Sequence, residues 1–339
     1  MLAQTFGATT LSPKVQSIPK VDELRLITLL NCDYKLLSKL LVQRLRLVLP
    51  SIIKSGQLCT VPGRNILFGV NNILSNLLYV NQKKSRGCLM NLDFFKAYDR
   101  VFLPFLIRVM EQMGFGNKFC TWIKMLHSGA KTRFLLEDLT KAIYVTFSIR
   151  QGDPLAMLIY VIYIEPLLLY LQRKVCGLRM ENTICSVESF CDDLNVLTDN
   201  LQDFILVDEG IRKFEAVSGA ILSRNQKCQV LGFGKWNNKI DWPLDYFKSV
   251  QQLKVFGIVV NNSYRNIIRL NWDHRISKLQ QCIIFNPKVP TACLVKTSSL
   301  KFCLFSLKYL IFIAISTSIS NATRFPRPEL QFPFEKLSK

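Results

Sequence analysis

Two acidic points far apart in the chain carry the strongest chemical signal. Asp93 ends a short apolar run, and Asp192 and Asp193 follow Phe190 and Cys191 much later in the sequence. One carboxylate after an apolar run says little, but a second acidic turn suggests acids brought together to hold metal. Mg²⁺, with Mn²⁺ as an alternative, takes carboxylate oxygens and completes its shell with water and phosphate oxygens. Two such ions would activate an attacking hydroxyl and stabilise a leaving pyrophosphate.

The other possible metal ligands favour oxygen chemistry. The chain has only two histidines, His127 and His274, so no zinc knuckle or finger can be assembled in the usual spacings. Its 11 cysteines are scattered, odd in number and never spaced as Cys-x-x-Cys. This pattern predicts reduced core cysteines in an intracellular protein.

The charge of the chain predicts a polyanionic partner. Lysine and arginine total 44 against 24 acids, a formal net charge of +20. From Tyr34 to Leu92 there is no acid, and the same segment holds nine bases: Lys35, Lys39, Arg44, Arg46, Lys54, Arg64, Lys83, Lys84 and Arg86. Such a segment, placed ahead of a carboxylate site, suggests a basic surface that neutralises nucleic-acid phosphates. A solvated basic face is the alternative for any single side chain.

Composition and periodicity place these acids in a folded α+β chain. At 339 residues with 49% hydrophobic side chains, one large domain or two to three subdomains is expected. The pattern predicts helices over 33–49, 66–80, 102–113, 118–128 and 206–217, a buried helix capped by Asp153 and starting at Pro154, a hairpin over 131–149, and strands over 88–92, 181–198 and 253–260. An antiparallel sheet then puts Asp93 at a strand end and Asp192 and Asp193 in a hairpin turn. Neighbouring strands lie about 5 Å apart, so these carboxylates could share metal.

The helix over 33–49 is predicted to be amphipathic and to stop at Pro50. Leu37, Leu40, Leu41, Leu45 and Val48 share one face of a helical wheel, with Lys35, Lys39 and Arg46 on the opposite face. Arg44 falls on the apolar side, where it would need a buried partner.

The first 20 residues show no periodicity and no compact apolar core, which predicts an unstructured leader without a secretory signal. The apolar runs 155–171 and 309–319 are shorter than the ~20 residues of a membrane span. Both are expected to be buried helices. The chain is therefore expected to be intracellular, in the nucleus or the cytoplasm, without a membrane partner.

An ordered series of motifs resembles the reverse transcriptase domain of non-LTR, LINE-like retrotransposons over residues 21–300. Leu92-Asp93-Phe94-Phe95-Lys96-Ala97-Tyr98-Asp99 resembles palm motif A of that family, and Phe190-Cys191-Asp192-Asp193 stands where motif C has Tyr-Ala-Asp-Asp. The other matching elements are Leu26 to Lys39 and Thr60 to Arg64 in the fingers, Arg150 to Leu155 as motif B, Ser218 to Lys227 as motif D, and Phe256 to Ile258 as the primer grip. Any one of these is a weak signal, whereas their common order is specific.

The resemblance implies the polymerase right-hand fold, an antiparallel palm sheet flanked by helices with fingers and a partial helical thumb. The implied boundaries are a leader over 1–20, fingers over 21–87, a palm over 88–262 with a fingers insertion at about 129–150, a partial thumb over 263–320 and a tail over 321–339. It also implies the partners: an RNA template, a DNA primer and deoxynucleoside triphosphates.

Residue roles follow from the same resemblance. Asp93 and Asp192 would be the main metal ligands, with Asp193 as a third carboxylate and Lys227 as the proton donor to pyrophosphate. Phe94, Tyr98, Gln151 and Gly152 would bind the nucleotide, Tyr98 by stacking under the sugar and excluding a 2′-hydroxyl. Lys35, Lys39, Arg46 and Arg64 would contact nucleic-acid phosphates. Asp99 and Asp153 are interpreted as capping or ion-pairing residues.

The sequence departs from the family around these motifs. Phe190 and Cys191 replace Tyr and Ala, and Ala156-Met157 replaces Ser-Pro after motif B. No endonuclease domain precedes the motifs and no cysteine-histidine knuckle follows them, so the chain resembles a partial or degenerate copy whose parent could carry such domains. An RNA-directed DNA polymerase is the first hypothesis. A polymerase-shaped nucleic-acid-binding protein without turnover is the second, and a nuclease is a distant third.

Overall fold

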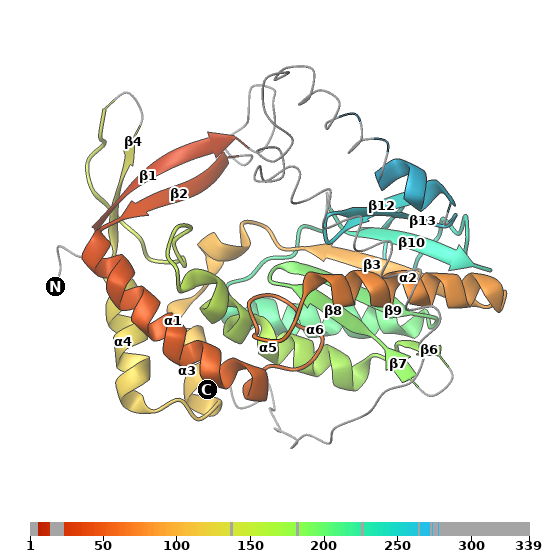
Figure 1. Cartoon of the computed structure of the whole chain (residues 1–339), viewed down its shortest axis with the longest axis horizontal. Helices are drawn as coiled ribbons and strands as arrows, with labels where there is room; N and C mark the ends of the chain where they lie inside the picture. Colours follow the sequence, from red (N-terminus) through yellow and green to blue (C-terminus); the bar gives the residue numbers. More distant parts are fainter. Residues whose placement is uncertain are drawn as a thin grey trace, which may run out of the picture.

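The computed structural model describes residues 6–13, 24–135, 138–180, 183–224, 227–263, 265–271, 273 and 277. Within them, a five-stranded sheet lies between helices, and a second, four-stranded sheet projects from one end (Figure 1). The larger sheet has the order β11 (Lys248–Ser249), β10 (Gln229–Gly234), β3 (Arg86–Asp93), β9 (Asp193–Thr198), β8 (Val187–Phe190). Its pairs are antiparallel except β10 with β11.

The central strand β3 is buried because its apolar side chains serve both faces of the sheet. Cys88, Met90 and Leu92 join one hydrophobic cluster, while Leu89 joins another. This alternation is the period of two expected of a strand. It confirms the strand predicted over 88–92 and brings Asp93 to its end.

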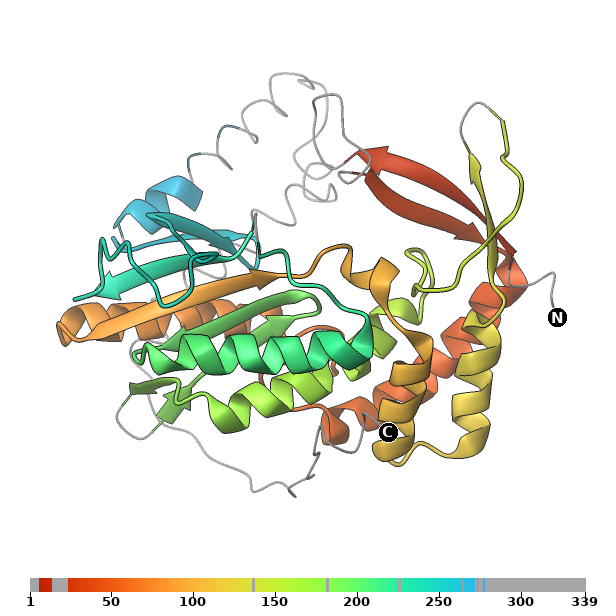
Figure 2. The ribbon, with the colours of Figure 1, turned by 180° about the vertical axis from the view of Figure 1, so that it is seen from behind.

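Helices cover both faces of this sheet. α5 (Ala156–Lys174) and α6 (Gln202–Ser218) lie together on one face, and α2 (Ile66–Gln82) lies on the other (Figure 2). α3 (Leu103–Gln112) packs beside α5, and α4 (Asn117–His127) packs against α3. In the described part of the chain, α5 has the length and apolarity of a membrane span, but 78% of that window is buried inside the fold. It therefore packs as the core helix that its apolar run predicted.

The smaller sheet corrects the prediction of an unstructured leader, because residues 6–13 form a strand. Its order is β2 (Leu24–Leu30), β1 (Phe6–Pro13), β4 (Lys131–Leu135), β5 (Ile143–Tyr144). Buried hydroxyl groups of Thr9, Thr28 and Thr132 hydrogen-bond across the three longer strands. Such cross-strand pairs stabilise a strand that shows no apolar periodicity of its own. The predicted hairpin over 131–149 is confirmed by β4 and β5.

Two further predictions are wrong in detail. α1 (Cys32–Ile52) continues through Pro50, and its buried face consists of Tyr34, Ser38, Leu41, Leu45 and Leu49. Leu40 and Val48, predicted to be buried, are 59% and 41% exposed, and Arg44 is exposed, so it needs no buried partner. The segment over 253–260 is a hairpin of β12 (Gln252–Val255) and β13 (Ile258–Asn261), turning at Phe256 and Gly257 with positive φ, rather than one strand.

The remaining elements complete the part of the fold that the structure describes. A 3₁₀ turn, η3 (Ala97–Arg100), follows β3, and β6 (Leu178–Met180) pairs with β7 (Thr183–Cys185) ahead of β8. Residues 265–271 are helical. Most of the predicted thumb over 263–320, including the apolar run 309–319, and all of the tail over 321–339 lie outside the described residues.

Candidate active site

Two of the three predicted carboxylates meet across adjacent strands. Asp93 is the last residue of β3 and Asp193 the first of β9, and the strand register pairs them directly. Both lie on the same face of the sheet, because directly opposed residues share a face. Asp93 and Asp193 therefore lie together at one end of the strands of the five-stranded sheet, which we call the acidic edge.

The carboxylate of Asp193 is held by three hydrogen bonds. Its carboxylate accepts hydrogen bonds from Nδ2 of Asn91 at 2.8 Å and Nδ2 of Asn195 at 3.2 Å, and from the backbone N–H of Phe256 at 3.5 Å. Burial raises the pKa of this carboxyl above its ordinary value, and the hydrogen bonds oppose that shift. Asp193 thus supports the edge more than it offers free oxygens to a ligand.

Asp93 faces a cation. Its Oδ2 accepts a hydrogen bond from Nζ of Lys227 at 2.8 Å and a longer one from Oγ of Ser223 at 3.5 Å. The carboxylate is 35% exposed and the lysine 55% exposed, so the pair is open to solvent. Lys227, predicted from motif D, therefore reaches the predicted metal-binding carboxylate.

Asp192 occupies the two-residue turn between β8 and β9. Phe190 and Asp193 pair across that turn, and Cys191 has a left-handed φ of 56°. Burial raises the pKa of Tyr160, and the negative charges of Asp192 and Asp93 raise it further. Asp192 directly precedes Asp193, which pairs with Asp93, so the turn brings Asp192 to the same end of the sheet as Asp93. Among the described residues, no three acidic, histidine or cysteine side chains are grouped as a ready-made metal cluster.

Tyr98 is fixed by stacking. Its ring lies on Tyr160 with centroids 4.7 Å apart and planes at 25°, and its carbonyl accepts a hydrogen bond from the Ile149 N–H at 2.9 Å. Burial and, to a smaller extent, Asp192 raise its pKa above the ordinary tyrosine value. The predicted sugar-facing aromatic is thus held rigidly beside the acidic edge.

Phe94 is a correction to the predicted nucleotide-binding set. It is 3% exposed and packs edge-on against Phe214 of α6, with centroids 6.4 Å apart. The alternation of β3 explains this, because the residue after Asp93 points to the opposite face. The exposed neighbour is Phe95, at 37%.

Gln151 and Gly152 connect motif B to the smaller sheet. The Thr28 N–H donates to the Gln151 carbonyl at 2.8 Å. Gly152 has a φ of 110°, and a Cβ at this position would overlap the Thr28 carbonyl oxygen. The glycine is therefore required first by the close approach of β2, a reason that the sequence alone did not reveal.

Asp153 is buried behind motif B. Its Oδ1 accepts a hydrogen bond from the Leu155 N–H at 2.9 Å. The helix starts at Ala156 rather than at Pro154, and Leu155 stands at its N-cap, so the prediction that Asp153 caps this helix is wrong. Tyr34 donates to its Oδ2 at 2.7 Å, and Ser38 donates to its Oδ1. Burial lowers the pKa of His127, whose Nε2 lies 3.7 Å from this carboxylate.

The predicted phosphate contacts divide into two groups. Lys39 and Arg46 are exposed on α1, and Lys35 is half-buried there. Arg64 is different, because its guanidinium donates to the main-chain carbonyls of Ile53, Lys54 and Gln57. Those bonds close the chain after α1, so Arg64 has a structural task, and its phosphate contact stays a prediction.

A disulfide corrects the prediction that every cysteine is reduced. Cys59 and Cys191 are joined, with Cα atoms 5.5 Å apart, while Cys32, Cys88, Cys120, Cys176, Cys185 and Cys228 are free. Gln57 supports the same contact, because its Oε1 accepts from the N–H groups of both bonded cysteines. The turn that carries Asp192 is therefore tied to the segment after α1.

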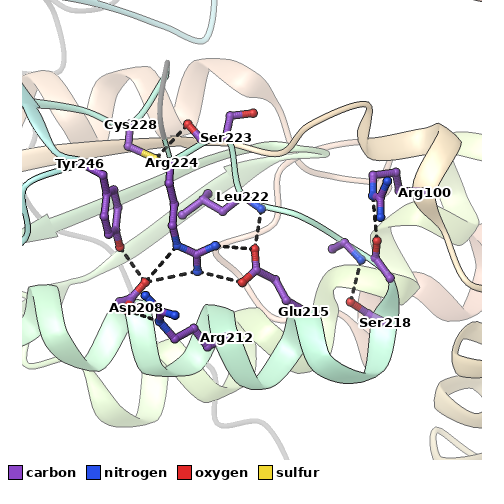
Figure 3. Close-up of polar contacts among 12 residues, drawn as sticks. Arg100, Asp208, Arg212, Glu215, Ser218, Leu222, Ser223, Arg224, Cys228 and Tyr246 are labelled. Carbon is purple, nitrogen blue, oxygen red and sulfur yellow. Dashed lines mark hydrogen bonds and ion pairs between the residues drawn. The ribbon is translucent and has the colours of Figure 1, made fainter. Parts of the chain in front are cut away.

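Sequence reasoning missed the residues that fix the segment ahead of Lys227. Arg224, three positions earlier, directs its guanidinium back to Glu215 and Asp208 of α6 (Figure 3). An arginine in an irregular segment gives no periodic signal. A signal existed only in the spacing, because acids at 208 and 215 share one side of a helix.

The sequence is also similar to known proteins. Residues 15–260 match the family model described as reverse transcriptase (RNA-dependent DNA polymerase). The chain is 28% identical over 280 residues to the transposon TX1 uncharacterized 149 kDa protein of Xenopus laevis, covering 79% of this chain and 21% of that protein. It is 29% identical over 134 residues to the retrovirus-related Pol polyprotein from type-1 retrotransposable element R2 of Popillia japonica, covering 38% of this chain and 22% of that protein. The chain thus spans about a fifth of the length of these relatives.

Solved structures show the same fold at low identity. Telomerase from Candida tropicalis in complex with a fragment of telomeric RNA superposes with a TM-score of 0.55 at 14% identity, over 94% of this chain and 55% of that chain. Apo telomerase from Candida tropicalis without its C-terminal domain gives a TM-score of 0.51 at 15% identity, over 76% and 54%. The predicted right-hand polymerase fold, of class α+β, is confirmed.

Proposed function

Because the chain belongs to the reverse transcriptase family, and its relatives include non-LTR retrotransposon proteins, we propose that it performs RNA-directed DNA synthesis. In this reaction the 3′-hydroxyl of a DNA primer attacks the α-phosphorus of a deoxynucleoside triphosphate, and pyrophosphate leaves. The observation that supports it best is the convergence of Asp93 and Asp192 at one sheet edge beside the stacked Tyr98.

The donor set of this edge fits the divalent ions that reverse transcriptases generally use. Asp93 offers an accessible carboxylate, and Asp192 adds a second negative charge at the same end of the sheet. Oxygen ligands of this kind suit Mg²⁺ or Mn²⁺. Asp93 and Asp192 would hold the ions, and Asp193 would orient the edge. When bound, two ions would supply activation of the primer hydroxyl and charge stabilisation at the leaving group.

Other side chains of this protein take the remaining roles. Tyr98, held on Tyr160, would support the deoxyribose and reject a 2′-hydroxyl, because a fixed ring cannot yield to the extra oxygen. Lys227 would leave Asp93 when metal binds and donate a proton to pyrophosphate. Gln151 and Gly152 would line the nucleotide pocket next to β2.

The net charge of +20 supports a nucleic-acid partner. We propose an RNA template and a DNA primer, with Lys35, Lys39 and Arg46 on α1 as phosphate contacts. A longer protein could supply endonuclease or further RNA-binding domains, because the relatives extend well beyond the matched segment.

Primer extension on an RNA template tests this proposal. The wild-type chain with Mg²⁺ should extend the primer, and Asp192→Asn should reduce the rate by at least about a hundredfold, since a metal ligand contributes several kcal/mol. Asp138→Asn is the matched control, because this acid is exposed and stands outside the site. Equal incorporation by the wild type and Asp192→Asn would refute the catalytic role. Salt-sensitive RNA binding without any synthesis would instead support an inactive binding protein.

A further inference from the structure

The segment that carries Lys227 is attached to the acidic edge along its backbone. It leaves α6 at Gly219, where φ is 83°. The Ile221 carbonyl then accepts a hydrogen bond from the Phe95 N–H at 2.8 Å, and the Ser223 N–H donates to the Asp93 carbonyl at 2.9 Å. The chain next to Lys227 is thus paired with the end of β3, and only side chains can fix it from the other side.

Arg224 and Glu215 provide that second attachment. The guanidinium donates through Nη1 and Nη2 to the two carboxylate oxygens of Glu215, each at 2.8 Å. Glu215 Oε1 also accepts the Leu222 N–H at 2.6 Å. One carboxylate therefore holds both the backbone and a side chain of this segment (Figure 3). A two-point arginine fork fixes direction as well as distance.

Asp208 extends this attachment along α6, because it lies about two helical turns before Glu215. Its Oδ1 lies 3.3 Å from Nη2 of Arg224 and accepts the Tyr246 hydroxyl at 2.8 Å, while Arg212 bonds its Oδ2 at 2.6 Å. These donors lower the pKa of Asp208 in spite of its partial burial, the largest opposing influence. Arg224 is therefore held between two acidic side chains. We name the three residues Asp208, Glu215 and Arg224 the Arg224 clamp.

We propose that Arg224 and Glu215 are positioning residues that set the reach of the Lys227 ammonium to Asp93. The proposal rests on the proposed function, because it concerns the lysine that would protonate pyrophosphate. Among the described residues the clamp bonds neither Asp93 nor Lys227. It acts through Ser223, the neighbour of Arg224, whose carbonyl accepts a hydrogen bond from the Lys227 N–H at 3.2 Å. Lysine could not replace Arg224, since a single ammonium cannot bond both oxygens of Glu215 in a fixed plane.

The Arg224 clamp lies near the surface and does not fill the hydrophobic core. Arg224 and Glu215 keep 20% and 17% of their side-chain exposure. Both line a hollow of about 560 Å³ that opens to solvent, together with Arg100 and Arg212. Removal of the guanidinium would therefore admit water rather than leave an empty cavity, and the fold would survive the change.

Acetylation of lysines in the full chain tests the position of Lys227 without any need for activity. The rate of labelling is read by peptide mass spectrometry for Lys227 and for Lys213, an exposed lysine paired with Glu209 on α6. Arg224→Gln, Arg224→Lys and Glu215→Gln should each raise labelling of Lys227 about two- to fivefold, the factor expected for loss of an open ion pair. Glu209→Gln should raise labelling of Lys213 alone. Unchanged labelling of Lys227 in folded Arg224→Gln would overturn the proposal.

A double-mutant cycle tests the consequence for synthesis. Lys227→Gln should slow single-nucleotide incorporation by about a hundredfold, as expected for loss of a general acid, and Arg224→Gln by about tenfold. If Arg224 acts through Lys227, the double variant should be no slower than Lys227→Gln alone. Effects that multiply would contradict the proposal. A wild-type chain without synthesis would refute the proposed function, while the labelling rates would still decide the clamp.

Discussion

Two segments frame the acidic edge, and they are anchored by opposite means. Motif B, with Gln151 and Gly152, is held by the Asp153 cluster, which we define as Tyr34, Ser38, His127 and Asp153. Motif D, with Lys227, is held by the Arg224 clamp. The first anchor is closed to solvent, with Asp153 6% exposed and Ser38 fully buried, whereas the second is made of ions that keep partial contact with water.

The difference teaches which anchor belongs to folding and which to activity. A buried carboxylate needs its donors, because the free energy of an unpaired buried charge is several kcal/mol unfavourable. A partly exposed ion pair loses less, because water replaces its partner. Damage to the Asp153 cluster should therefore unfold the protein, while damage to the Arg224 clamp should misplace one lysine.

The largest effect is expected for Asp153→Ala. The change leaves the Tyr34 hydroxyl, the Ser38 hydroxyl and the Leu155 N–H without their acceptor inside the core. The free energy of unfolding should fall by about 3–5 kcal/mol. Urea denaturation measures it, with the exposed Asp138→Ala as the control. A loss below about 1 kcal/mol would contradict the distinction between the two anchors.

Glu165 is a buried acid with fewer hydrogen-bond donors than Asp153 has in its cluster. It is fully buried in α5, and its Oε1 accepts the Lys54 N–H at 2.7 Å. Its Oε2 has no hydrogen-bond partner within the described part of the chain. Burial raises the pKa of its carboxyl from 4.5 to about 8. The folded state therefore binds a proton that the unfolded state has released, so stability is lost as the pH rises from about 4.5 to 8.

Glu165→Gln should remove this pH dependence. The amide oxygen can still accept the Lys54 N–H, and no charge has to be buried. At pH 8 the variant should be more stable than the wild type by about 3 kcal/mol, and at pH 5 the two should nearly coincide. Thermal unfolding followed across this range decides the point. Parallel curves for the two proteins would show that Glu165 keeps an ordinary pKa.

Gly152→Ala tests the contact between motif B and β2. The new Cβ would meet the Thr28 carbonyl in a backbone conformation that alanine rarely adopts. A loss of about 2–3 kcal/mol is expected from the clash and the strain together. Gly114→Ala is a matched control, because Gly114 also has positive φ, 85°, but nothing within 4 Å of the added Cβ. Equal losses for the two variants would mean that strain alone matters at Gly152.

The sequence predicted the acidic edge well because its signals are local. Asp93 ends an apolar run, and Asp192 lies in a two-residue turn. The antiparallel pairing of β3 with β9 is enough to bring the two together. Phe94 is buried on the opposite face from Asp93, as the period of two along β3 requires, whereas the family resemblance predicts it at the nucleotide. β1 was missed because its stability comes from Thr28 and Thr132, which are distant in sequence. Contacts of that kind, like those of Arg224 and Arg64, are decided by the fold and leave no pattern along the chain.

The smallest effect is expected at the rim of the Arg224 clamp. Arg212 pairs with Asp208 one helical turn away, but its side chain is 64% exposed. Arg212→Gln should change the free energy of unfolding by no more than about 0.5 kcal/mol, since exposed helical ion pairs contribute little. Tyr246 and Arg224 would still satisfy Asp208. Urea denaturation at low and at high salt measures this contribution. A loss comparable to that of Asp153→Ala would show that the charges on α6 stabilise the fold as strongly as the Asp153 cluster does. In that case exposure would not separate the two anchors, and the labelling of Lys227 would have to be compared among variants of equal stability.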